Sequence, residues 1–210
     1  MRRIDISWSL YAGMPSFPGD PPFVREPVRS IARGDPYNLS AIRLGTHAGT
    51  HVDPPIHFVA GGATIDRVDL DQLNGPCRVV DVPASATSVG PAEVGALPPG
   101  TERVLFRTSN SPKWQRRPEY FPEYVAVAPT AAHPLLARGV RVVGIDSLSI
   151  ERDSTGTFPV HHALLGGGAL IVEGLLLAEA PAGNYELECF PLKLRDGDGG
   201  PARAALRTEI

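Results

Sequence analysis

The chain has 210 residues, of which 42% are hydrophobic and 20% are charged, and its formal net charge is −3. This is the balance of an ordinary globular protein, long enough to bury a core of its own. No basic tract is longer than Arg116-Arg117, so we expect no nucleic-acid partner. The most apolar run, ALIVEGLLLAEA, is too short for a membrane span and contains Glu173, and the first residues show no apolar stretch of secretory length. We therefore expect a cytoplasmic protein with no membrane partner.

Alternating and β-branched runs predict strands along most of the chain. The expected strands cover residues 2–10, 38–47, 77–84, 102–109, 124–129, 140–147, 168–175, 184–194 and 202–209. A loop rich in proline and glycine covers residues 11–22, and helices are expected over 90–97, 129–139 and 159–167. Strands come first, then strand–helix alternation, then strands again. This order predicts an α/β fold, with residues 1–210 as a single domain built on a mixed β-sheet.

The chain has two cysteines, Cys77 and Cys189, and each lies in a hydrophobic run that reads as a strand. Two isolated cysteines in apolar segments of a cytoplasmic protein are more often buried thiols than a disulfide. We expect both to be free.

Histidines gather in the segment THAGTHVDPPIHF, which contains His47, His51, Asp53 and His57 and holds three of the six histidines of the chain. A strand places residues i and i+2 on one face, so His51 and Asp53 can point the same way. His47 can join them if the chain bends at Gly49. A helix is the poorer interpretation, because the segment contains glycine, β-branched residues and two prolines. A polar loop with scattered histidines and a structural zinc site are the alternatives, but structural zinc sites usually use cysteines, and none is nearby.

A second group of candidate ligands is His161, His162 and Glu173. Burying a carboxylate in an apolar strand is costly unless a cation lies near it or the strand is at an exposed edge. Alone, the two adjacent histidines could equally be helix-cap or core residues. The sixth histidine, His133, is most simply a helix-surface or packing residue.

The two groups together offer five donors, namely His47, His51, Asp53, His161 and Glu173. A tetrahedral zinc ion with an open position uses only three protein ligands. Five donors, two of them carboxylates able to bridge, suit a pair of metal ions about 3.5–4 Å apart. A single zinc or manganese ion with five or six ligands is the alternative.

The string HAGTHVDPPIH resembles the signature HxGTHxDxPxH of the cyclase family of metal-dependent hydrolases, which includes the bacterial kynurenine formamidases (arylformamidases) and the isatin hydrolases. Weaker likenesses follow in the right order: PSFPGDPPF, GPCRVVDV, VVGIDSLSIERDST, HHALLGGGALIVEGL and YELECFPLKL. The resemblance covers most of the chain. It implies a swivelling β/β/α fold and a homodimer or larger homo-oligomer with partner residues near the site.

The resemblance also implies the ligand arrangement. His47, His51 and Asp53 would hold one metal ion, His161 would hold a second, and Asp53 and Glu173 would bridge the two. The cofactor implied is zinc, two ions per subunit, with manganese possible.

Other residues receive roles from the same resemblance. His57 would be the acid–base residue, and His162 carries no assigned role. Phe17 would contact the substrate, although the formamidases often have tryptophan at this position before Pro-Gly-Asp. Trp8 could wall the site or belong to the core, and Asp146 could orient a ligand histidine or cap a turn.

The implied activity is hydrolysis of N-formyl-L-kynurenine, a small aromatic formamide, to L-kynurenine and formate in tryptophan degradation. Hydroxide formed from metal-activated water would attack the formyl carbon, and His57 would carry the proton to the leaving amine. A hydrolase acting on a cyclic amide or ester, such as isatin or a lactone, is the alternative, and so is a non-catalytic metal-binding module. A serine hydrolase is disfavoured because the chain has no G-x-S-x-G motif.

Overall fold

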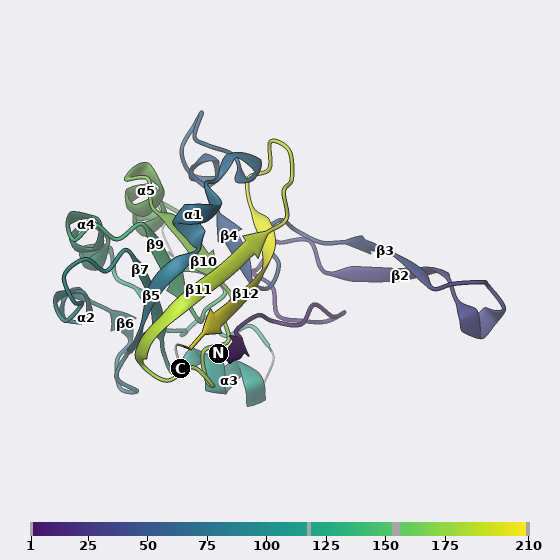
Figure 1. The fold of residues 1–210 in the computed structure, drawn as a ribbon, viewed down its shortest axis with the longest axis horizontal. Helices are drawn as coiled ribbons and strands as arrows, with labels where there is room; N and C mark the ends of the chain where they lie inside the picture. The colour runs from purple at the N-terminus through teal and green to yellow at the C-terminus, as the bar shows by residue number, and fades with distance from the viewer. Residues whose placement is uncertain (1, 117–118, 153–155, 209–210) are drawn as a thin grey trace.

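The largest element of the fold is an eight-stranded mixed sheet that curls back on itself (Figure 1). The computed structural model describes residues 2–116, 119–152 and 156–208. The strand order is β1-β12-β11-β5-β7-β9-β10-β4, and β4 also pairs with β12, so the sheet becomes barrel-like. The strands are β1 (Arg3–Asp5), β4 (His51–Asp53), β5 (Gly75–Asp81), β7 (Arg103–Arg107), β9 (Val142–Ile145), β10 (Leu170–Glu173), β11 (Gly183–Pro191) and β12 (Gly200–Arg207).

The middle of the sheet is parallel, because β5, β7, β9 and β10 are joined by helical crossovers. These crossovers contain α2 (Pro91–Gly95), α3 (Asn110–Arg116), α4 (Pro129–Ala137) and α5 (Pro159–Gly166), while α1 (Leu70–Leu73) precedes β5. In Figure 1, α2, α4 and α5 lie together on one side of the sheet. The remaining strands pair antiparallel, so the predicted mixed sheet is confirmed.

Both faces of the parallel strands are buried. Along β7, Leu105 points into the inner core, to which every strand in the closed part of the sheet contributes. Val104 and Phe106 point to the other face and pack beneath the helices. Strands buried on both faces read as continuous hydrophobic runs, which is why the sequence predicts β7, β9 and β10 well. The two cysteines, Cys77 and Cys189, lie buried in the inner core as free thiols, as predicted.

A two-stranded arm extends from the body, formed by β2 (Val24–Arg29) and β3 (Leu39–Arg43) with a short 3-10 turn, η1 (Ile31–Arg33), at its tip (Figure 1). The arm carries large apolar side chains that are about half exposed or more. They are Val28, Ile31, Tyr37, Leu39 and Ile42. The strand expected over 38–47 is thus present in part, but it pairs only within this arm.

Other expectations are met in part. Over residues 2–10 only β1 and a bridge at Ser7 form, and over 124–129 only the two-residue β8 (Ala126–Val127), paired with β6 (Ser88–Val89). The closing strand over 202–209 corresponds to β12, with residue 209 outside the described part. The three expected helices are present, whereas α1, α3 and the 3-10 turns were not predicted because they are too short to show a helical period. Among the described residues, no helix is both long and apolar enough to cross a membrane.

Candidate metal centre

The pairing of β4 with β10 brings the two groups of candidate ligands together. In this antiparallel pair Glu173 lies opposite His51, and Ile171 lies opposite Asp53. Val52, between His51 and Asp53, points into the inner core. Because side chains alternate across a sheet, His51, Asp53 and Glu173 all lie on the other face, as the i, i+2 spacing predicts for the first two.

Two glycines allow the chain to reach this arrangement. Gly49 has φ +65°, so the bend expected between His47 and β4 is present. Gly174, directly after Glu173, has φ +64°, and a side chain there would overlap the carbonyl group of Gly49. The Thr50 hydroxyl donates to the Gly174 carbonyl at 2.5 Å. The two segments therefore meet backbone to backbone beside the site.

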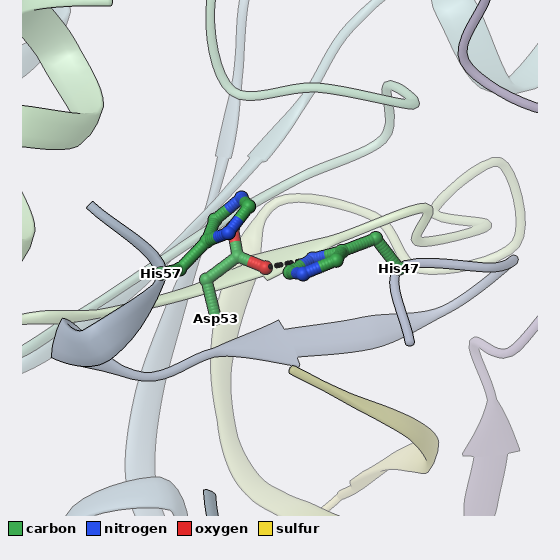
Figure 2. Close-up of side chains that lie close together, drawn as sticks. All are labelled: His47, Asp53 and His57. Atoms are coloured by element: carbon green, nitrogen blue, oxygen red, sulfur yellow. Dashed lines mark hydrogen bonds and ion pairs between the residues drawn. The ribbon is translucent and has the colours of Figure 1, made fainter. Parts of the chain in front are cut away.

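Asp53 lies at the middle of the first group. Its Oδ1 is 2.8 Å from His47 Nδ1, the contact drawn in Figure 2, and 3.3 Å from His51 Nε2. The ring of His57 stacks on that of His47 with 3.9 Å between centroids. His47, Asp53 and His57 come close enough for their donor atoms to share one cation, and so do His51, Asp53 and Glu173.

Glu173 and Asp53 connect the first group to His161. Glu173 Oε2 is 3.3 Å from His51 Nε2, and its Oε1 is 3.3 Å from His161 Nε2. The same nitrogen of His161 lies 3.8 Å from Asp53 Oδ2. Each carboxylate thus lies between histidines from segments more than a hundred residues apart.

The hydrogen bonds on the outer side of two rings determine which nitrogen faces the site. His51 Nδ1 is 2.9 Å from the Gly49 carbonyl, and His161 Nδ1 is 2.6 Å from Glu151 Oε1. Each Nδ1–H donates outward, so each Nε2 faces the carboxylates and is the atom that could bind a cation. His51 Nε2, His47 Nε2 and Asp53 Oδ2 are buried without a hydrogen-bond partner. Buried polar atoms are rarely left unpaired, and this donor set suits a divalent cation.

The charges of the site point the same way. Burial alone would raise the pKa of Asp53, but the neighbouring His51 and His47 outweigh it and hold that pKa well below its ordinary value. Burial likewise opposes protonation of His161, yet Glu151 and Glu173 raise its pKa to about 10. In the absence of a metal, buried carboxylates draw protons onto the histidines. A bound cation takes the place of those protons, which is why metal binding to such sites releases protons.

His57 differs from the other histidines of the site. It lies in the 3-10 turn η2 (Pro55–His57) and is partly exposed. Burial lowers its pKa from the ordinary value of a histidine, which favours the neutral imidazole. Phe58 stacks on His161 and meets His57 edge-on, with 4.4 Å between centroids in each case.

Sequence reasoning missed three residues of the site. Glu151 is buried, but the residues before it, Ser147 to Ile150, alternate between polar and apolar and give no signal for a buried carboxylate. Phe58 ends the histidine-rich segment and reads as a core residue. Asp198 Oδ2 lies 3.9 Å from His47 Nε2 at the exposed rim, in a glycine-rich loop with no signal of its own.

The loop before the arm also reaches the site. The Asp20 amide donates to the Phe17 carbonyl in a turn, and both residues are half-buried. Burial raises the pKa of Asp20, which also interacts electrostatically with His47 and His51. The Phe17 ring meets Tyr120 edge-on, with 6.2 Å between the ring centroids.

The structure decides between the alternatives left open for two residues. Trp8 belongs to the core, where it packs edge-on against Trp114 at 5.8 Å. Asp146 accepts hydrogen bonds from Thr108 and Ser111 at the start of α3, so it caps a turn and does not orient a ligand histidine. His133 and His162 are exposed on α4 and α5.

Three comparisons with known proteins complete the description. The family described as putative cyclase matches residues 4–152. The kynurenine formamidase of Salinibacter ruber is 41% identical over 211 aligned positions, covering 99% of this chain and 98% of that protein. The structure of a potential metal-dependent hydrolase with cyclase activity superposes with a TM-score of 0.85 at 33% identity, covering 100% of this chain and 99% of the other. Isatin hydrolase A from Labrenzia aggregata superposes with a TM-score of 0.82 at 24% identity, covering 99% and 94%, which shows a shared fold.

Proposed function

The chain belongs to the cyclase family and is a hydrolase, and from that premise we propose that it hydrolyses N-formyl-L-kynurenine to L-kynurenine and formate in tryptophan degradation. One observation carries the proposal. Buried donor atoms without partners converge beside His57, whose pKa burial lowers, in a chain 41% identical to a kynurenine formamidase over almost its full length. Residues 1–210 would form one hydrolase domain.

The donor set supports a metal cofactor, and we assign its ligands as His47, His51, Asp53, His161 and Glu173. We propose two zinc ions per subunit, because Asp53 and Glu173 each lie between histidines of both segments and would help to hold both ions; manganese is the alternative. When bound, such ions lower the pKa of a water molecule and stabilise negative charge on a carbonyl oxygen.

His57 is the proposed acid–base residue. Its neutral ring can accept the proton of the attacking water and return it to the nitrogen of the leaving aromatic amine. Stacking on His47 and the edge contact with Phe58 orient the ring for both transfers. Without that proton the aromatic amine would have to leave as an anion, which is a poor leaving group.

Phe17 is the proposed wall for the aromatic ring of the substrate, since its loop also carries Asp20 beside the site. A cyclic amide such as isatin is the second candidate substrate. Two observations favour this second candidate. The fold is shared with isatin hydrolase A, and Phe17 stands where formamidases often carry tryptophan.

The arm supports a homodimer or larger homo-oligomer. Its apolar side chains are between 48% and 59% exposed in the single chain, and a second copy of this chain is the proposed occupant that covers them. The two buried free thiols, Cys77 and Cys189, fit the reducing cytoplasm, where we place the protein.

Formate release from N-formyl-L-kynurenine by protein of measured metal content tests the proposal. We expect turnover that a chelator abolishes and zinc restores, with isatin and a small lactone converted far more slowly. Asp53→Ala and Glu173→Ala should lower the metal bound per chain, whereas removal of Asp146, a buried carboxylate that accepts from Thr108 and Ser111, in Asp146→Ala should not. Turnover that survives complete metal removal would contradict the metal assignment, and preferential hydrolysis of isatin would replace the substrate.

A further inference from the structure

Glu151 is a buried carboxylate that contacts His161 of the site, and the residue is only 3% exposed. Both of its oxygens are used. Oε2 accepts the backbone N–H of Val160 at 3.0 Å, and Oε1 accepts the backbone N–H of His161 at 2.9 Å and the ring Nδ1–H of His161 at 2.6 Å. Three donors from one short segment therefore converge on one carboxylate.

Two of these bonds hold the start of α5. Pro159, the first helical residue, has no N–H, and Phe158 at the N-cap has φ 45° and no side-chain cap. The Val160 and His161 amides would be left without partners at the helix start, and Glu151 satisfies both. A negative charge at this end also complements the helix dipole. Glu151 thus fixes the backbone from which His161 projects.

The third bond acts on the ring itself. A carboxylate can only accept, so Nδ1 of His161 carries the proton and Nε2 faces Asp53 and Glu173. The corresponding bond of His51 goes to a neutral backbone carbonyl, that of Gly49. An imidazole hydrogen-bonded to a carboxylate donates electrons to a metal ion more strongly than an imidazole hydrogen-bonded to a carbonyl group. The two histidines are therefore unequal ligands.

We propose that Glu151 is a positioning residue of the metal centre, which holds the ring, tautomer and donor strength of His161 while contacting neither metal nor substrate. The assignment rests on the proposed function only in taking His161 as a ligand. It gives the His161 side of the site a carboxylate–histidine pair that the His51 side lacks.

The test is Glu151→Gln, which keeps the size of the side chain but removes its charge and turns an NH₂ group toward one of the amides. Zinc affinity, measured by competition with a chromophoric chelator, should fall about 10- to 100-fold. The matched control is Asp146→Asn, an equally buried carboxylate that holds the start of α3 through Thr108 and Ser111. It should lower the melting temperature and leave zinc affinity unchanged.

A second measurement reads the position of the His161 proton directly. In the zinc-loaded wild-type protein with ¹⁵N-labelled histidine, nuclear magnetic resonance should show the His161 proton on Nδ1, and in Glu151→Gln that proton signal should move upfield. A proton on Nε2, or a Glu151→Gln protein that is merely less stable but binds zinc as tightly as the wild type, overturns the proposal. Neither readout uses a substrate, so loss of the formamidase assignment would leave this test intact.

Discussion

Gly174→Ala should separate the two segments that build the site. A non-glycine residue at φ +64° costs about 1–2 kcal/mol from backbone strain alone. The new Cβ would also overlap the backbone of Gly49, which cannot rotate away as a side chain could, and overpacking of this kind costs about 1–3 kcal/mol. The expected destabilisation is therefore about 2–5 kcal/mol, with β10 displaced from β4.

Gly139→Ala is the matched control. Gly139 has φ +82° in the turn after α4, and a Cβ there would meet nothing within 4 Å. Gly139→Ala introduces the same kind of backbone strain as Gly174→Ala but no overlap, so it should lower the free energy of unfolding by about 1–2 kcal/mol. In a chain of this size each kcal/mol corresponds to roughly 2–4 °C in the melting temperature.

Calorimetry of the metal-free proteins measures the two costs, and zinc titration measures the consequence for the site. We expect Gly174→Ala to melt several degrees below Gly139→Ala and to bind zinc more weakly than wild type, because Glu173 no longer lies opposite His51. Equal melting temperatures for the two variants, or unchanged zinc affinity in Gly174→Ala, would refute the reasoning.

Three further outcomes are expected. His57→Ala should keep its metal and lose about 10²- to 10⁴-fold in kcat, measured as formate release; undiminished turnover would remove His57 from the proton transfer. In the wild type, the acid limb of kcat/KM should lie at a lower pH than an ordinary histidine would give, because burial lowers the pKa of His57 and only the neutral ring accepts a proton. An acid limb above pH 6.5 would contradict this assignment. Burial raises the pKa of Cys189 to about 12 and that of Cys77 well above its ordinary value, so a thiol-reactive disulfide reagent should modify neither until the protein unfolds, and one fast native thiol would show the burial to be wrong.

Much of the fold follows from local pattern. The runs that became β7, β9 and β10 are hydrophobic on both faces, and α4 and α5 begin at a proline and end near a glycine, so short-range chemistry was enough to predict them. The arm and the extent of β1 and β8 could not be predicted in this way. Their pairing depends on contacts with distant parts of the chain, which no local window contains.

The site divides in the same manner. The spacing of His47, His51 and Asp53 around Gly49 determined by itself that these donors would lie together, because a bend and one strand connect them. The sequence also marked Glu173 as a carboxylate that needs a counter-charge, without showing where that charge would be.

Only the tertiary structure decided what completes the site. The register of β10 against β4 sets Glu173 opposite His51, and a slip of one residue would turn it into the inner core. The packing of α5 brings Glu151 onto the outer nitrogen of His161, while Asp146, another buried carboxylate, accepts hydrogen bonds at the start of α3 instead. Composition and spacing state which groups a chain can offer, whereas strand register and helix docking, set by the burial of apolar surface across the whole chain, determine which of those groups meet.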